Sequence, residues 1–329
     1  MLKTVKTYLP GLMACIAITI ATSFLSQNYG GPQLLYALLI GLSLHVIYDR
    51  EVIKPGVDFC AKNMLRLGVA FLGIRITFSD IAAIGLSTGL MLVIAVTATV
   101  CLGFILAKLL NLSTDSGLIA GGSVGICGAS AALAIASVLP KTKDNERFTL
   151  LVVVGVTILS SLAMVIYPFL LQAMDISPLF AGIFLGATIH DVAQVVAAGM
   201  IFGPEAGDVA TVVKLFRVAL LLPVVLFISV FLGAQTSSKK LGWASLRLIP
   251  NFLLGFMALS VVASMQILPL PTIESISDLS RWMLVIAIAA SGVKTSFKEL
   301  GKLGWKPVLM LLVETIFIAS IGFAFIRVV

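Results

Sequence analysis

Long apolar runs separated by short polar stretches repeat along the whole chain, and none shows the strict alternation of a half-buried strand. Most are long enough to cross the hydrocarbon core of a bilayer as helices, whereas barrel strands would alternate over about ten residues. The pattern therefore predicts membrane-spanning helices. Eleven runs can be marked, over residues 9–26, 33–48, 63–79, 86–109, 116–140, 148–173, 178–203, 209–234, 249–268, 280–293 and 305–327.

Composition supports a membrane protein. Of the 329 residues, 60% are hydrophobic and only 11% are charged, whereas soluble domains are about 45–50% apolar and about 25% charged. A water-soluble core could not hide so much apolar surface. We predict one all-α polytopic membrane domain, residues 1–329, with about 9–11 transmembrane segments, inverted repeats and two broken or re-entrant helices in its core.

The net charge of +7 bears on topology. Lysines and arginines gather in the short connecting loops, which indicates contact with the lipid bilayer and its anionic headgroups rather than with nucleic acid. Lys3 and Lys6 place the N-terminus in the cytoplasm, before a first helix that we expect to be uncleaved. The count of crossings then leaves the C-terminus outside.

One basic loop, "PKTKDNER" at 140–147, conflicts with this count because it falls outside when every run crosses once. The loop returns to the cytoplasm if run 116–140 enters the membrane and leaves on the same side. Run 178–203 must then also turn back to keep the later basic loops inside. The charge pattern favours two re-entrant segments, and two full crossings are the open alternative.

The first of these two runs contains "GGSVGICGASAA", residues 121–132, with four glycines. Irregular backbone at membrane depth is tolerated where it is buried in protein or lines a water-filled cavity. A helix that restarts near Gly128 would point free N–H groups and a positive dipole end at that cavity, which suits an anion. Close helix packing through small residues is the alternative. The predicted substrate ligands are Ser123, Gly125, Cys127, Gly128 and Ser130.

The second run contains "GATIHDVAQVVAAG", with polar residues in an otherwise apolar segment. Ionisable groups within a membrane are costly and usually functional. We expect Asp191 to cap a restarting helix, and His190 and Gln194, four apart, to face the substrate. His190 and Asp191 are the candidates for H⁺ or Na⁺ coupling. A polar cluster that only ties two helices together is the alternative. With His45 as the sole other histidine, we expect neither a metal nor a cofactor.

Four further basic residues are candidates for an anion path. Lys214 and Arg217 lie three apart near a helix start, where snorkelling to the interface explains them equally well. Arg75 and Lys294 occupy matching positions of an internal repeat, although anchoring at the interface is a simpler explanation.

That repeat relates "GIRITFSDIAAIG" at 73–85 to "GVKTSFKELGKLG" at 292–304, with nine of thirteen positions identical or similar. The copies are separated by an odd number of crossings and so have opposite orientations. Inverted repeats are typical of secondary transporters, and chance similarity in a biased composition is the alternative. The predicted halves are 27–173, with broken element 114–140, and 178–329, with broken element 178–203.

Four stretches together, "LRLGVAFLGIRITFSDI", "GGSVGICGASAALA", "IHDVAQVVAAG" and "KLFRVALLLP", resemble the YeiH-like sulfate exporter family of bacterial inner-membrane proteins. The resemblance covers about residues 10–327. It implies an inner-membrane location and export of sulfate or small sulfonates. It also implies a fold akin to the sodium–bile-acid symporter and cation–proton antiporter group, in which two broken, crossing elements pack beside a panel domain and homodimers are common.

The sequence therefore predicts a secondary active transporter of a small anion, such as sulfate or an organosulfonate, that works by alternating access. Its site would lie at the midplane between the breaks at 123–130 and 188–194, and His190→Ala or Ser130→Ala should weaken transport. The alternatives are an anion channel that uses the same breaks, a membrane protein without a transport function, and an intramembrane enzyme built on Cys127. No catalytic sequence motif supports the enzyme.

Overall fold

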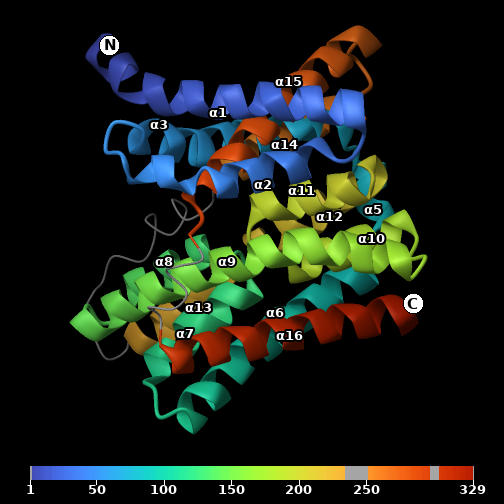
Figure 1. Ribbon diagram of the computed structural model, residues 1–329. Helices are drawn as coiled ribbons and strands as arrows, with labels where there is room; N and C mark the ends of the chain where they lie inside the picture. Colours follow the sequence, from blue (N-terminus) through green and yellow to red (C-terminus); the bar gives the residue numbers. More distant parts are fainter. Residues whose placement is uncertain (1, 234–250, 297–303, 329) are drawn as a thin grey trace.

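The computed structural model describes residues 2–233, 251–296 and 304–328 (Figure 1), and these form helices with no strand among them. Six of the helices found there are long and apolar enough to cross a membrane. The chain is therefore an all-α, multi-pass membrane protein, as its hydrophobic pattern predicts. The six spans are Thr7–Tyr29, Gly85–Leu109, Lys143–Ala173, Pro204–Ile228, Leu270–Lys294 and Trp305–Val328.

The helices pack into two bundles, which lie at the top and the bottom of Figure 1. The outer bundle contains α1 (Leu2–Tyr29), α2 (Gln33–Ser43), η1 (His45–Asp49), α3 (Lys54–Phe59), η2 (Cys60–Met64), α4 (Leu65–Leu72), η3 (Gly73–Arg75), α14 (Asn251–Ser264) and α15 (Leu270–Lys294). The core bundle contains α6 (Gly85–Leu109), α7 (Thr114–Gly125), α8 (Ala129–Val138), α9 (Lys143–Ala173), α10 (Pro178–Thr188), α11 (Val192–Phe202), α12 (Pro204–Ala219), α13 (Leu221–Gly233) and α16 (Trp305–Val328). The short helix α5 (Phe78–Ala83) contacts both.

Close backbone contacts at glycines hold each bundle together. In the outer bundle, a Cβ added to Gly41 on α2 would lie 2.5 Å from the carbonyl oxygen of Ala289 on α15. In the core bundle, a Cβ added to Gly103 on α6 would lie 2.5 Å from the carbonyl oxygen of Gly117 on α7. Small residues allow this approach, and in a lipid environment close packing supplies much of the attraction between helices.

Helices α7 and α8 form a re-entrant hairpin. The side chain of Asn145, near the start of α9, donates to Asp115 Oδ2 at 2.8 Å and to the carbonyl oxygen of Pro140 at 2.9 Å. These two acceptors mark the first turn of α7 and the end of α8, so both ends of the hairpin lie together. Midway along it, a Cβ added to Gly122 would overlap the side chain of Ile135. The basic loop after α8 therefore returns to the side from which α7 starts, as its charges predict.

Helices α10 and α11 form the second hairpin. A Cβ added to Gly182 on α10 would lie 2.8 Å from the carbonyl oxygen of Ala206, and one added to Gly199 on α11 would lie 3.0 Å from the same oxygen. Because one turn of α12 touches both helices, α10 and α11 run side by side in opposite directions. The crossing of two broken helices implied by the resemblance is therefore wrong, because each chain segment turns back at its break.

The tips of the two hairpins meet in the core bundle. The 31-residue helix α9 connects them, so they enter from opposite ends of the molecule (Figure 1). At the meeting point a Cβ added to Gly128 would lie 3.4 Å from His190 Cβ. Gly128 has a φ of +64°, which favours glycine. The turns lie between Gly125 and Ala129 and between Thr188 and Val192, inside the two predicted breaks.

The internal repeat is visible only in part. Gly85 and Gly304 occupy equivalent positions, have φ values of +80° and +77°, and stand directly at the start of α6 and α16. Residues 297–303 of the second copy lie outside the described residues. Each predicted half supplies helices to both bundles, and the division into inverted halves stays a prediction.

Candidate functional site

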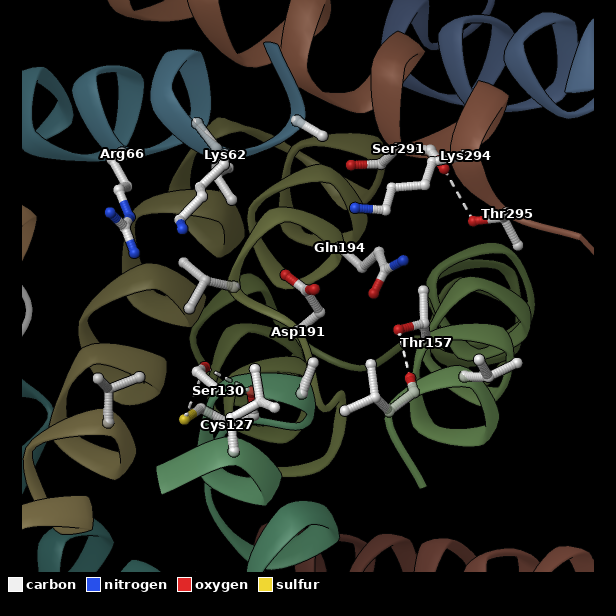
Figure 2. Close-up of a pocket in the computed structure, with 18 of the residues that line it drawn as sticks. Lys62, Arg66, Cys127, Ser130, Thr157, Asp191, Gln194, Ser291, Lys294 and Thr295 are labelled. Atoms are coloured by element: carbon white, nitrogen blue, oxygen red, sulfur yellow. Dashed lines mark hydrogen bonds between the residues drawn. The ribbon is translucent and has the colours of Figure 1, made fainter. Parts of the chain in front are cut away.

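A cavity of about 540 Å³ lies between the two bundles and beside the hairpin tips (Figure 2). Each bundle supplies part of its wall, so a ligand held there would touch both. The polar and charged residues of the wall are Lys62, Arg66, Ser291, Lys294, Thr295 and Ser296 from the outer-bundle side, and Cys127, Ser130, Thr157, Asp191 and Gln194 from the core bundle.

The N-terminus of α8 opens into this cavity. Its N-cap, Gly128, has no side chain to bond the first N–H groups, and those groups have no acceptor within their own helix. Ala129 and Ser130, in the first turn, line the cavity. Ser130 Oγ donates to the carbonyl oxygen of Cys127 at 3.2 Å and also lies 3.2 Å from its Sγ. Free N–H groups and a positive helix dipole at this point favour an anionic ligand.

The N-terminus of α11 reaches the same cavity but carries its own carboxylate. Asp191 is the N-cap, as predicted, and its Oδ1 accepts from the backbone N–H of Ala193 at 2.9 Å. The backbone N–H of Asp191 donates to Ser160 Oγ on α9 at 3.0 Å. The two helix starts therefore differ: one is open to an anion, and the other is already capped by a negative charge.

Three basic side chains line the cavity from the outer bundle. Lys62 and Arg66 are exposed and four residues apart, and so lie on one face of the continuous η2–α4 helix. Lys294, at the end of α15, bonds Asp58 Oδ1 at 2.7 Å. Lys294, one of the four basic residues predicted to line an anion path, therefore does line the cavity. The sequence interpretation did not name Lys62 and Arg66 as candidates. Their four-residue spacing just before an apolar run was the available signal.

Lys214 and Arg217 do not line the cavity. Both side chains are fully buried in the core bundle. Lys214 Nζ donates to the carbonyl oxygen of Ile126 at 2.9 Å and to that of Ile189 at 2.8 Å. One ammonium group therefore joins the tip of the first hairpin to the tip of the second.

Arg217 continues this bridge. Its guanidinium donates to Val124 and Gly125 at the end of α7, at 2.7–3.0 Å, and to Gly186, Ala187 and Ile189 at the end of α10, at 2.6–3.3 Å. These carbonyls are the negative ends of two helices and would find no hydrogen-bond donor in lipid. The two cations thus neutralise the helix ends, and these contacts provide neither the expected anion path nor snorkelling.

Other predicted ligands also lie behind the cavity wall. Ser123 Oγ donates to the carbonyl oxygen of Gly128 at 2.9 Å and closes the first tip. The carbonyl of Gly125 is taken by Arg217, as described above. Arg75 does not line the cavity. It forms an ion pair with Asp208 on α12 at 3.2 Å. Of the proposed ligands in the first tip, only Cys127 and Ser130 present side chains to the cavity.

His190 is fully buried and does not line the cavity. Its Nε2 lies 2.9 Å from Thr315 Oγ1 on α16. Thr315 donates its own proton to the carbonyl oxygen of Leu311 at 2.7 Å, so Nε2 is the donor in the contact with His190. This arrangement ties the second tip to α16 and places His190 behind the cavity wall, so its contact with substrate stays a prediction.

We predict that Gly128→Ala destabilises the protein. A side chain at φ +64° is strained, and the new methyl group would press on His190 at the meeting point of the tips. The expected cost is about 1–3 kcal/mol, measured as a lower melting temperature of the purified protein. Gly203→Ala is the matched control, because its φ of 164° is extended and nothing lies within 4 Å of its added Cβ. Equal melting of the two variants would contradict the assigned tip geometry.

The part of the chain that forms the cavity is also the part that matches known proteins. The family model described as "Conserved hypothetical protein 698" matches residues 10–311, which include every cavity residue named above. The chain is similar to a UPF0324 membrane protein of Chlorobaculum tepidum, with 44% identity over 314 residues, 95% of this chain and 87% of that protein. It is 42% identical to the UPF0324 membrane protein TauZ of Paracoccus denitrificans over 316 residues, 96% of this chain and 94% of that protein.

Proposed function

This chain belongs to the conserved hypothetical protein 698 family, the UPF0324 membrane proteins, and we propose that it is a secondary active transporter of a small anion. One observation carries the proposal: a cavity between two helical bundles combines three basic side chains with an uncapped helix N-terminus. Fixed positive charge and free N–H groups in one enclosure are what an anion needs on leaving water.

The fold supports alternating access as the mechanism. Lys214 and Arg217 fasten both hairpin tips to α12, so the core bundle can move as one body. The basic residues belong to the other bundle. A displacement of one bundle against the other would therefore open the cavity to the opposite side while the anion stays at the tips. Two opposed hairpins with their turns at mid-depth suit such a mechanism.

Sulfate or an organosulfonate is the proposed substrate class. Arg66 can offer a fork of parallel N–H donors to two oxygens of a sulfo group, and the free N–H groups at the start of α8 face the same cavity. We place the protein in the bacterial inner membrane with a cytoplasmic N-terminus and an outside C-terminus. Lys62 and Lys294 then lie toward the cytoplasm, where an exporter would load its substrate. Asp191, the acid in the cavity, is the proposed coupling group.

Counterflow of labelled sulfate tests the proposal. Proteoliposomes of the purified protein, loaded with unlabelled sulfate, should accumulate external labelled sulfate. In Arg66→Leu the half-saturating sulfate concentration should rise on the order of tenfold to a hundredfold, since a hydrogen bond to a charged group contributes about 1.5–3 kcal/mol.

The control for this experiment is Arg281→Leu, which removes an exposed arginine of α15 that does not line the cavity. Its counterflow should match that of the wild type. Equal effects of the two substitutions would contradict the assigned site. Absence of counterflow in folded wild-type protein would contradict sulfate transport, and ion currents far above carrier rates would favour a channel.

A further inference from the structure

The orientation of the Gln194 amide can be derived from its neighbours. Ser161 Oγ donates its only proton to the carbonyl oxygen of Thr157 at 2.9 Å. In its contact with Gln194, also at 2.9 Å, Ser161 must therefore accept, which identifies the Gln194 atom as Nε2. Gln194 Oε1 then points elsewhere. It is buried and has no hydrogen-bond partner among the described residues.

This orientation changes what Gln194 can bind. The residue lines the cavity, and one of the two N–H groups of its amide is used against α9. The buried polar atom without a partner is Oε1, an acceptor, which repels an anionic oxygen. Gln194 as an anion ligand stays a prediction, which would depend on the second N–H of Nε2. A buried carbonyl oxygen without a partner is costly, and it indicates a donor or a cation as its missing partner.

Two further acceptors surround the same space. Asp191 and Gln194 are three residues apart and so share one face of α11, and Figure 2 shows Asp191 near the centre of the cavity, Gln194 to its right and Thr157 below Gln194. Thr157 donates its proton to the carbonyl oxygen of Val153 at 2.7 Å, which leaves only lone pairs on Oγ1. A carboxyl group, an amide oxygen and a hydroxyl oxygen thus come from residues that line one cavity, together with basic residues of the outer bundle.

Two of the nearby basic groups have hydrogen-bond partners of their own. Lys294 bonds Asp58, and Lys214 bonds two backbone carbonyls at the hairpin tips. Lys62 and Arg66 lie on the outer bundle, across the cavity from α11 (Figure 2). The cavity is therefore bipolar, with a positive side at the rim and at the start of α8 and an electron-rich side formed by Asp191, Gln194 and Thr157.

We propose that Asp191, Gln194 and Thr157 form a subsite for a monovalent cationic group that is bound together with the anion. The group is either the ammonium of a zwitterionic aminosulfonate or a sodium ion. This inference rests on the proposed function and extends it, because it assigns the second charge that the bound species carries. Oxygen ligands of this kind satisfy the N–H donors of an ammonium and also suit a hard cation.

A matched pair of ligands separates the two sources. Binding of 2-aminoethanesulfonate and of ethanesulfonate to the full-length protein in nanodiscs is measured by calorimetry, once in choline buffer and once in sodium buffer. An ammonium subsite makes the amino compound bind on the order of tenfold to a hundredfold more tightly in both buffers. A sodium subsite makes both sulfonates bind more tightly when sodium replaces choline.

Two variants show where the effect arises. Asp191→Asn keeps an N-cap oxygen for α11 but removes the charge, and it should abolish whichever preference the wild type shows. Asp115→Asn, in the first turn of α7 and away from the cavity, should keep that preference.

If the two sulfonates bind with equal affinity, and if that affinity is the same in sodium and choline buffer, the subsite is wrong. The proposal of anion transport would not be affected by that result. A preference that persists in folded Asp191→Asn would overturn the subsite in the same way. If neither sulfonate nor sulfate binds the folded wild type, the proposed function fails together with the subsite.

Discussion

Arg217→Leu is expected to lower the free energy of unfolding by about 3–5 kcal/mol, the cost of breaking a buried charged contact by removing one partner. The guanidinium serves five backbone carbonyls at the ends of α7 and α10, and leucine can serve none of them. Each carbonyl left without a donor in the protein interior adds about 1–3 kcal/mol before relaxation. The hairpin tips should therefore separate or the protein should fail to accumulate.

Thermal unfolding of the detergent-solubilised protein measures this effect. Arg217→Lys should lie between leucine and the wild type, because an ammonium keeps the charge but lacks the planar fork that reaches both helix ends. Arg281→Leu, on the exposed side of α15, should melt like the wild type. A melting temperature of Arg217→Leu equal to that of Arg281→Leu would show that the tips do not depend on this contact.

The breaks in the two hairpins could be predicted from the sequence because their causes are local. Glycine supplies the positive φ at residue 128, and Asp191 caps the helix that follows it directly. The re-entrant course of run 116–140 could also be predicted from charge. The basic loop at 140–147 satisfies the positive-inside rule only if this run turns back. Membrane crossing, helix class and breaks thus follow from composition, charge and short-range hydrogen bonding.

The roles of the basic residues could not be predicted in this way, because they depend on which helices become neighbours. Lys214 and Arg217 are three apart in an apolar run, and the sequence does not show that carbonyls 25–93 residues away surround them. The direction of the Gln194 amide depends on how Ser161 uses its proton. The position of Lys62 and Arg66 opposite the hairpin tips arises only when the two bundles dock.

The ion pair between Arg75 and Asp208 offers a way to stop the movement that alternating access requires. It joins η3 of the outer bundle to α12 of the core bundle at 3.2 Å, and both side chains are partly exposed. In a protein whose four native cysteines are replaced by alanine, cysteines at these two positions can be bridged by a bifunctional methanethiosulfonate. Neither position lines the cavity, and of the cavity residues only Cys127 is changed in this background.

Sulfate counterflow before bridging, after bridging and after reduction tests alternating access most directly. We predict that counterflow falls to the background of empty liposomes in the bridged protein and returns when the disulfides are reduced. Each single-cysteine variant, treated in the same way, should keep its counterflow. Undiminished counterflow through fully bridged protein would contradict a mechanism in which the core bundle moves against the outer bundle.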